Sequence, residues 1–219
     1  MDVFDYINEN DAVGLRALIQ RQPVAAAARS PVGLSPVMFA LYHRKPDLAR
    51  VIVDTGYETD PFEAAALGDA RRFEELLDPE PTLVDARSVD GFTPLHLACF
   101  FDRIQVVRLL LERDADPNVA AENLSEVHPI HSAVAARSVE IVKLLLEHGA
   151  DPNARQHGGW TPLHAAAMHG HQELARLLLA HQADRSAFSD DGKDAATLAE
   201  EGGHPELARL LRSESQRGG

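Results

Sequence analysis

The sequence predicts an all-α solenoid, a protein built from stacked helix-turn-helix units. Three observations support this fold class. A short block of residues recurs along the 219-residue chain, an apolar segment follows each clear copy at a fixed offset, and aromatic side chains are scarce. Because aromatics make up 5% of the residues and hydrophobic residues 45%, the core must be mainly aliphatic, which suits closely stacked helices.

The clearest repeat is the block GFTPLHLA at residues 91–98, which returns as GWTPLHAA at residues 159–166. Weaker copies begin near Gly33 and Val127. An apolar segment follows, with matching versions at residues 106–111, 141–146 and 174–179, and the turn sequence ADPN then occurs at residues 115–118 and 150–153. Three elements in a fixed order indicate one structural unit copied along the chain.

The spacing of the block defines the units. The residues at its proline position are Val3, Pro36, Pro61, Pro94, Pro129, Pro162 and Ala195, at steps of 33, 25, 33, 35, 33 and 33 residues. The TPLH block, the apolar helix and the ADPN turn resemble ankyrin repeats, which have a period of about 33 residues. The resemblance covers nearly the whole chain and implies one repeat domain over 1–211, followed by a disordered polar tail over 212–219.

Seven units are expected, and their approximate ranges are 1–33, 34–58, 59–91, 92–126, 127–159, 160–192 and 193–211. The first and last lack the full block and carry polar residues in its place, as terminal repeats that cap an array do. We therefore expect the array and the chain to end together.

Particular residues explain why each repeat forms two packed helices. Thr93 is a good N-cap, and Pro94 occupies the first helical position, where a missing N–H costs nothing. The alanines at 165–167 make the first helix narrow, while Leu174, Leu177 and Leu178 form one apolar stripe on the second. No unit can bury its apolar face alone, so stability comes from neighbouring units.

Two steps depart from the period. The step of 25 residues leaves too little chain for a projecting β-turn finger between units two and three, so we expect that finger to be missing or shortened. The step of 35 predicts a finger around Ala120–Glu126 that is two residues longer than the others and contains no glycine.

The resemblance also implies where a partner protein binds, namely on the concave face of the first helices and on the finger tips. Carried over to this chain, the positions are Tyr42, His43, Leu67, Phe92, Phe100, Phe101, Val127, Trp160, Met168 and His169. Five of the twelve aromatic residues fall on this list, and large aromatics in a groove commonly anchor interfaces.

Other interpretations of these residues stay open at this point. Phe92 and Trp160 can equally fold back over an adjacent finger and fill space. One of Phe100 and Phe101 can turn into the core while the other faces the groove, and the sequence does not decide which. An acidic rim is expected from Asp90, Glu122, Glu126, Asp190 and Asp191, so the groove suits a helix or loop with apolar and basic residues.

Charge narrows the class of partner. The formal net charge of −13 disfavours nucleic acids and anionic lipid surfaces as partners, although it can also serve solubility alone.

The single cysteine, Cys99, cannot form an intrachain disulfide, which favours a reducing compartment. Without an 18-residue apolar stretch or a secretory leader, we expect a cytoplasmic protein, and we expect a monomer.

We therefore expect a protein–protein interaction module acting as an adaptor, inhibitor or assembly partner, with no cofactor and no catalytic residue. The first alternative is a structural or self-associating protein, and a less favoured one is an enzyme or small-molecule binder on a repeat frame. Eleven histidines suggest metal binding, but the block positions His96, His131 and His164 fit backbone hydrogen bonding better, and no ligand set is completed elsewhere.

Overall fold

The computed structural model describes residues 1–213, and this part of the chain is all-α and contains no β-strand. The predicted fold class is confirmed, and the seven expected repeats are present as seven helical hairpins in the described residues. The helices group into two compact units, one of residues Met1–Leu83 and a second that begins at Val84. The single domain expected over 1–211 stays a prediction.

The first unit contains three hairpins. Their helices are α1 (Val3–Asn8) with α2 (Ala12–Arg21), α3 (Pro36–Tyr42) with α4 (Pro46–Val53), and α5 (Pro61–Leu67) with α6 (Ala70–Leu77). A 3₁₀ helix, η1 (Pro23–Ala27), follows α2, and a second, η2 (Pro81–Asp85), follows α6. Within the unit, α1, α3 and α5 pack in sequence, as the stacking of hairpins requires.

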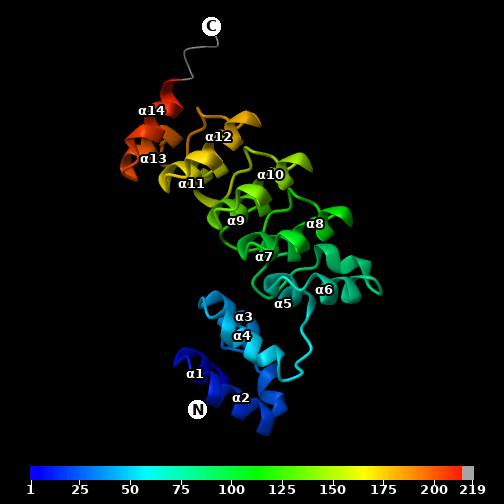
Figure 1. Ribbon diagram of the computed structural model, residues 1–219. Coiled ribbons are helices and arrows are strands. Elements are labelled where there is room, and N and C mark those ends of the chain that lie inside the picture. Colours follow the sequence, from blue (N-terminus) through cyan, green and yellow to red (C-terminus); the bar gives the residue numbers. More distant parts are fainter. Residues whose placement is uncertain (214–219) are drawn as a thin grey trace. The chain divides into compact units, whose positions relative to one another are not determined.

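The second unit contains four hairpins. Their helices are α7 (Pro94–Phe100) with α8 (Ile104–Glu112), α9 (Pro129–Ala135) with α10 (Val139–Glu147), α11 (Pro162–Met168) with α12 (Gln172–Ala180), and α13 (Ala195–Glu201) with α14 (Pro205–Ser213). A one-turn 3₁₀ helix, η3 (His157–Gly159), lies in one finger. In Figure 1, α7, α9 and α11 lie side by side as an inner layer, with α8, α10 and α12 beside them as an outer layer.

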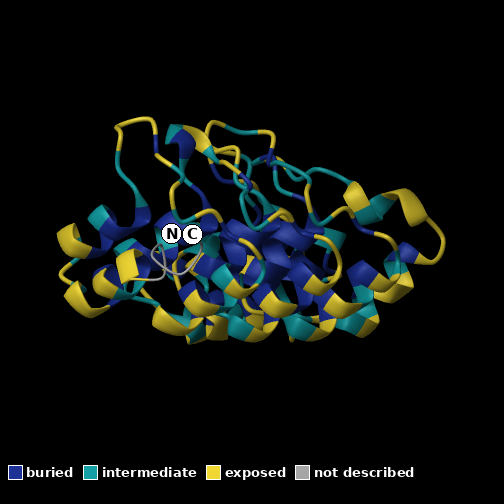
Figure 2. Ribbon diagram, turned by 90° about the horizontal axis from the view of Figure 1, so that it is seen from above, coloured by how far each residue is buried: buried dark blue, intermediate teal, exposed yellow. Residues whose placement is uncertain are grey.

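The inner helices begin where the sequence predicts. Five of the seven start with proline, and in α7 the Thr93 hydroxyl caps the main-chain N–H of His96 at 3.4 Å. Alanines such as Ala98 and Ala166 are fully buried, so adjacent inner helices approach closely. The outer helices complete the core with leucine, valine and isoleucine, and Figure 2 shows exposed residues on the helix faces that point away from it.

Four fingers close in the same way, through a main-chain hydrogen bond between residues four apart in the chain. These bonds join Ser30 to Leu34, Ser88 to Phe92, Gln156 to Trp160 and Ser189 to Lys193, with N···O distances of 2.9 to 3.0 Å. A glycine with positive φ completes each turn, for example Gly91 at +83°. L-residues with a Cβ rarely adopt this conformation, which explains the recurring glycine.

The finger before α9 closes differently. The N–H of Ala121 bonds to the carbonyl of Val127 at 2.8 Å, so this loop is two residues longer, as predicted. It contains no glycine, and Glu126 takes the positive φ, +50°, that glycine supplies elsewhere. The prediction of a shortened finger between the second and third repeats is also confirmed, because only residues 54–60 connect α4 to α5.

The ends of the chain differ slightly from expectation. α1 begins with a reciprocal capping box between Asp2 and Asp5, which suits a terminal repeat. At the other end, α14 runs to Ser213, so Arg212 and Ser213 belong to the last helix rather than to a polar tail. Arg212 forms an ion pair with Glu200, which holds this last turn against α13. The rest of the expected tail, 214–219, lies outside the described residues.

Replacing Gly91 with alanine should destabilise the protein more than replacing Gly192. Both glycines have positive φ, +83° and +77°, so both changes introduce backbone strain of about 1 kcal/mol. A Cβ on Gly91 would also overlap the main-chain carbonyl of Glu122 in the next finger, whereas a Cβ on Gly192 meets open space. We expect losses of about 2–3 kcal/mol and about 1 kcal/mol in urea unfolding. Equal losses would contradict the close approach of the two fingers.

Candidate partner-binding surface

Histidines of the repeated block join successive repeats of the second unit. Each Nε2 atom faces a main-chain carbonyl oxygen of the following finger, in the pairs His96–Val127 (2.9 Å), His131–Trp160 (3.3 Å) and His164–Ala187 (3.0 Å). Because a carbonyl oxygen only accepts, Nε2 carries the proton in each imidazole. The structural role that the sequence favoured for these three histidines is confirmed.

The other ring nitrogen of each histidine accepts a bond from its own repeat. Nδ1 of His164 accepts the main-chain N–H of Thr161 at 3.0 Å, and Nδ1 of His131 accepts the N–H of His128 at 3.1 Å. Burial lowers the pKa of His96 and of His131 to about 4, and it also lowers the pKa of His164. All three rings are therefore neutral near pH 7, the form that this pattern of one donor and one acceptor requires.

Asparagines of the ADPN turns form a second set of links. The side chain of Asn118 donates to the carbonyl of Gly149 at 2.9 Å and accepts the N–H of Asp151 at 2.7 Å. Asn153 repeats the arrangement one repeat later, on Gln182 at 3.2 Å and Asp184 at 2.6 Å. An amide suits this position because it offers both a donor and an acceptor.

The finger tips are linked by single main-chain hydrogen bonds. The N–H groups of Glu122, His157 and Asp190 donate to the carbonyls of Gly91, Ser125 and Gly158 in the preceding fingers, at 2.9 to 3.0 Å. The fingers of the second unit are therefore attached to one another at their bases and at their tips. They form an ordered row on which side chains take fixed positions.

In the first compact unit, other residues occupy the histidine position of the repeated block. Met38 and Glu63 occupy the block position that histidine holds in the second unit. Glu63 is fully buried, accepts the N–H of Asp60 at 2.9 Å and the hydroxyl of Tyr57 at 3.1 Å, and burial raises the pKa of its carboxyl group. It completes the capping box that begins α5.

Phe100 and Phe101 end α7 and lie at the surface. Phe100 is 46% exposed and Phe101 is partly exposed, and their rings meet edge to face with centroids 5.1 Å apart. The question left open by the sequence is answered, because Phe100 is the more exposed of the two and neither side chain is sealed in the core. Further along the same layer, α11 presents the partly exposed Met168 and the exposed His169.

The three predicted finger residues are half-buried. The rings of Phe92 and Trp160 lie beside the block histidines of their own repeats, with centroids 5.8 Å from His96 and 6.2 Å from His164. Val127 is likewise partly exposed, and its carbonyl holds His96. Part of each side chain therefore fills space at a finger base, as the space-filling interpretation held, and part remains accessible.

The remaining predicted residues, Tyr42, His43 and Leu67, lie in the first unit at the ends of α3 and α5. His43 is exposed, and its ring stacks on Phe39 with centroids 4.0 Å apart, while Tyr42 and Leu67 are partly exposed. Seven of the ten predicted residues thus belong to the second unit and three to the first.

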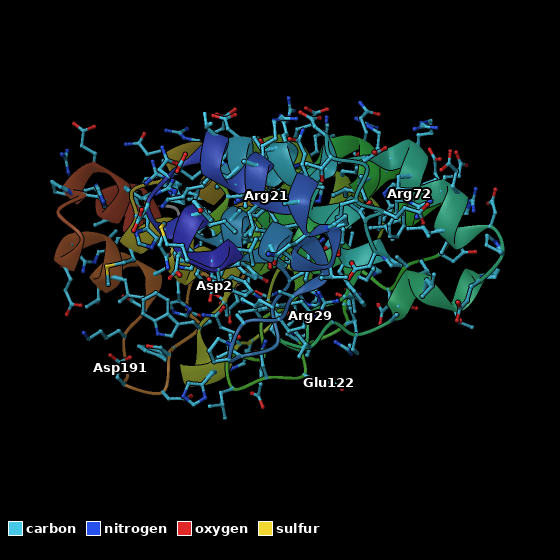
Figure 3. The ribbon with its side chains drawn as sticks, turned by 90° about the horizontal axis from the view of Figure 1, so that it is seen from below. Asp2, Arg21, Arg29, Arg72, Glu122 and Asp191 are labelled. Atoms are coloured by element: carbon cyan, nitrogen blue, oxygen red, sulfur yellow. The ribbon has the colours of Figure 1, made fainter. Side chains whose placement is uncertain are left out.

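The acidic rim is weaker than the sequence suggested. Three of its five carboxylates form ion pairs with neighbouring basic side chains, in the pairs Glu122–Arg87 (3.5 Å), Asp190–Arg155 (3.4 Å) and Asp191–Lys193 (3.5 Å). Glu122 and Asp191 both lie on projecting fingers in Figure 3. The sequence listed the acids correctly but did not show that arginines and lysine from the same row neutralise them.

Apolar finger tips were missed by the sequence analysis. Val89 is 67%, Leu124 93% and Phe188 57% exposed, each on a finger of the second unit. Their signal is an apolar residue at a turn position that polar residues normally occupy. They add exposed apolar side chains on the fingers to those at the ends of the inner helices.

The histidines, carboxylates and cysteine also bear on metal binding and thiol chemistry. No group of three or more His, Cys, Asp or Glu residues there has the geometry to hold a metal ion. Cys99 is fully buried, and burial raises the pKa of its thiol, which keeps it protonated and unreactive. None of the helices in residues 1–213 has the length and hydrophobicity that a bilayer crossing needs.

Comparison with known proteins agrees with the hairpin architecture. The family model described as "Ankyrin repeats (3 copies)" matches residues 62–156 and 130–217. The chain is 44% identical over 63 residues to "Probable E3 ubiquitin-protein ligase XBOS31" of Oryza sativa subsp. japonica, a stretch that covers 28% of this chain and 14% of that protein.

Two further relatives also match this chain over a short stretch. Serine/threonine-protein kinase VIK of Arabidopsis thaliana is 50% identical over 50 residues, or 23% of this chain and 11% of the kinase. Ankyrin repeat and SAM domain-containing protein 6 of Danio rerio is 37% identical over 57 residues, or 26% of this chain and 8% of that protein. The chain thus spans less than a sixth of the length of each of these three relatives.

The buried histidines predict acid sensitivity. The unfolded chain binds protons on these imidazoles below pH 6.5, whereas folded His96 and His131 stay neutral down to about pH 4. Their contribution is therefore complete above pH 6.5 and is lost as the pH falls, by about 2 kcal/mol per ring between pH 7 and 5. Urea unfolding of His131→Gln should show a shallower loss over this interval than the wild type. The exposed control His157→Gln should follow the wild type, and an unchanged slope in His131→Gln would contradict the assignment.

Proposed function

This chain belongs to the ankyrin-repeat family, and we propose that it is a stoichiometric protein-binding module that recognises its partner through the middle repeats. Ankyrin repeats are generally protein–protein interaction modules. The finer proposal is that the inner-helix ends and fingers around α7, α9 and α11 form the contact surface. In this role the chain acts as an adaptor, inhibitor or assembly partner and performs no reaction of its own.

The observation that carries the proposal is the surface pair Phe100 and Phe101. In a chain with only 5% aromatic residues, two adjacent phenylalanines end an inner helix, and the first is 46% exposed. Removing a phenylalanine side chain from water stabilises a complex by about 1.5–3 kcal/mol, so an interface that covers this pair gains substantially. Binding hot spots typically consist of such large side chains surrounded by more polar residues.

The surroundings of this pair support recognition rather than catalysis. Its position is fixed, because α7 is buried along its other face through Leu95, Leu97 and Ala98 and is tied to the next finger by His96. A rigid scaffold with fixed aromatic anchors loses little conformational entropy on binding. We further propose that the chain works as a monomer in the cytoplasm, consistent with a single, buried, unpaired cysteine.

Replacing both phenylalanines with serine should remove partner binding while leaving the fold intact. The test is cross-linking and affinity purification from the native host with quantitative mass spectrometry, in which proteins recovered with the wild type should fall at least ten-fold with Phe100→Ser/Phe101→Ser. The matched control is Val13→Ser/Val24→Ser, since both valines are 81% exposed and lie in the first unit.

Circular dichroism and urea unfolding would verify that both variants remain folded. Full retention of the same partners by the Phe100→Ser/Phe101→Ser variant would reject the proposed surface. Sedimentation at several concentrations separates the self-association alternative, which requires the wild type to dimerise and this variant to be monomeric.

A further inference from the structure

Arg137 and three histidines gather where the hairpin turns of three successive repeats lie next to one another. Arg137 stands in the turn between α9 and α10, His169 and His171 flank Gly170 in the turn between α11 and α12, and His204 precedes α14. The rings of His169 and His171 are 5.8 Å apart, and the ring of His204 rests against Gly170, where a Cβ would overlap it. We call these four residues the basic patch.

The members of the patch are close enough to act on each other electrostatically. The pKa of His171 is lowered, first by burial and then by the positive charges of Arg137, His169 and His204. These three are the charged groups that influence His171 from its own turn and from the turns on either side. Bringing such groups together costs free energy unless an anion accompanies them.

Three carboxylates on the neighbouring helices pair with other cations, whereas Glu173 and Glu206 lie in the first turns of α12 and α14. Glu140 of α10 pairs with Arg108 at 3.1 Å, and Glu201 of α13 pairs with Lys193 at 2.8 Å. Glu200, the other carboxylate at the end of α13, pairs with Arg212. Within residues 1–213, no ion pair joins Arg137 to a carboxylate, although the chain has 34 acidic and 21 basic residues. Arg137 therefore has no carboxylate partner despite the excess of acids.

The basic patch adjoins the apolar surface of the proposed binding site. Met168 directly precedes His169, and its main-chain carbonyl lies against Gly202 of the next turn. In the inner layer, α9 separates α11 from α7, which ends in Phe100 and Phe101. The surface thus changes along the layer from aromatic at α7 to basic at the turns beside α9, α11 and α13.

We propose that the basic patch binds acidic side chains of the partner protein, with Phe100 and Phe101 holding an apolar residue of the same segment. This inference rests on the proposed function and adds the chemistry of the partner. It differs from the basic partner that the net charge alone favours, because the basic patch lies beside the proposed binding surface. The partner segment is an amphipathic helix with an apolar end and an end rich in Glu or Asp.

Helix spacing sets the length of that segment. Adjacent packed helices lie about 8–10 Å apart, so the two steps from α7 to α11 span about 20 Å. A helix rises about 1.5 Å per residue, so the apolar anchor and the acidic residues are separated by about 13 residues. The segment runs across the inner helices, from the end of α7 towards the turn that contains His171.

Three synthetic peptides provide the test. Each is a fluorescein-labelled, lactam-stapled helix of 18 residues with Leu and Phe near one end, and the other end carries four Glu, four Gln or four Lys residues. In fluorescence anisotropy at pH 7.5 with the full chain, the Glu peptide should bind at least ten-fold more tightly than the Gln peptide. The Lys peptide should bind most weakly.

Matched protein variants separate the basic patch from general charge effects. Arg137→Gln/His171→Gln should remove the preference for the Glu peptide over the Gln and Lys peptides. The control Arg176→Gln/His181→Gln changes one arginine and one histidine of the same unit away from the patch, and it should retain this preference. Phe100→Ser should weaken all three peptides by a similar factor.

Equal affinities for the Glu and Lys peptides, with Phe100 still required, would overturn the charge inference and leave the proposed surface standing. An unchanged Glu preference in Arg137→Gln/His171→Gln would overturn it as well. Absence of measurable binding by the Glu peptide at 1 mM protein would also reject it, whereas the proposed function is judged separately by the partners lost with the phenylalanine pair.

Discussion

The fold depends on hydrogen bonds that each repeat makes to the next one. A single hairpin leaves one side of its apolar layer uncovered, so it is stable only against a neighbour. In the second unit, packing of alanine-rich inner helices brings neighbours close, and the neutral imidazoles of His96, His131 and His164 then bond to the following finger. Asn118 and Asn153 make the equivalent bonds at the other turn.

These bonds explain why the period is so regular there. Each block histidine must reach a carbonyl of the next finger, and each ADPN asparagine must reach the main chain of the next turn. Each finger tip must also form a hydrogen bond with the tip before it. An insertion is tolerated only where it does not shift these partners, and the long finger before α9 shows how. It closes through Ala121 and Val127, while Glu122 and Ser125 inside the loop still bond to the adjacent fingers. The exposed apolar side chains at the helix ends and finger tips take no part in these bonds, and they form part of the proposed binding surface.

Much of this architecture could be predicted from the sequence. Thr-Pro pairs fix the starts of inner helices, glycines mark the finger turns, and the step lengths of 25 and 35 residues foretold one short and one long finger. These features depend on short-range chemistry, which repeats with the sequence. Helix α14 exceeded its expected end by two residues, because the ion pair between Arg212 and Glu200 lies outside any local pattern.

The surface was harder to predict because it depends on contacts between repeats. No spacing rule contains the relative exposure of Phe100 and Phe101, which only the packed structure shows. The acidic rim was overestimated, since Arg87 and Arg155 belong to different repeats from the carboxylates that they neutralise. The basic patch escaped notice for the same reason, because its four members come from three separate turns.

Native-state hydrogen exchange tests most directly whether bonds between repeats hold the fingers in place. The amides of Glu122, His157 and Asp190 donate to the preceding finger, whereas within the described residues the neighbouring amide of Leu124 makes no hydrogen bond. We expect the three bonded amides to exchange at least a hundred-fold more slowly than that of Leu124, at rates near those of helices α9 and α10. Exchange of all four at the same fast rate would show that the fingers are independent loops and would contradict the account.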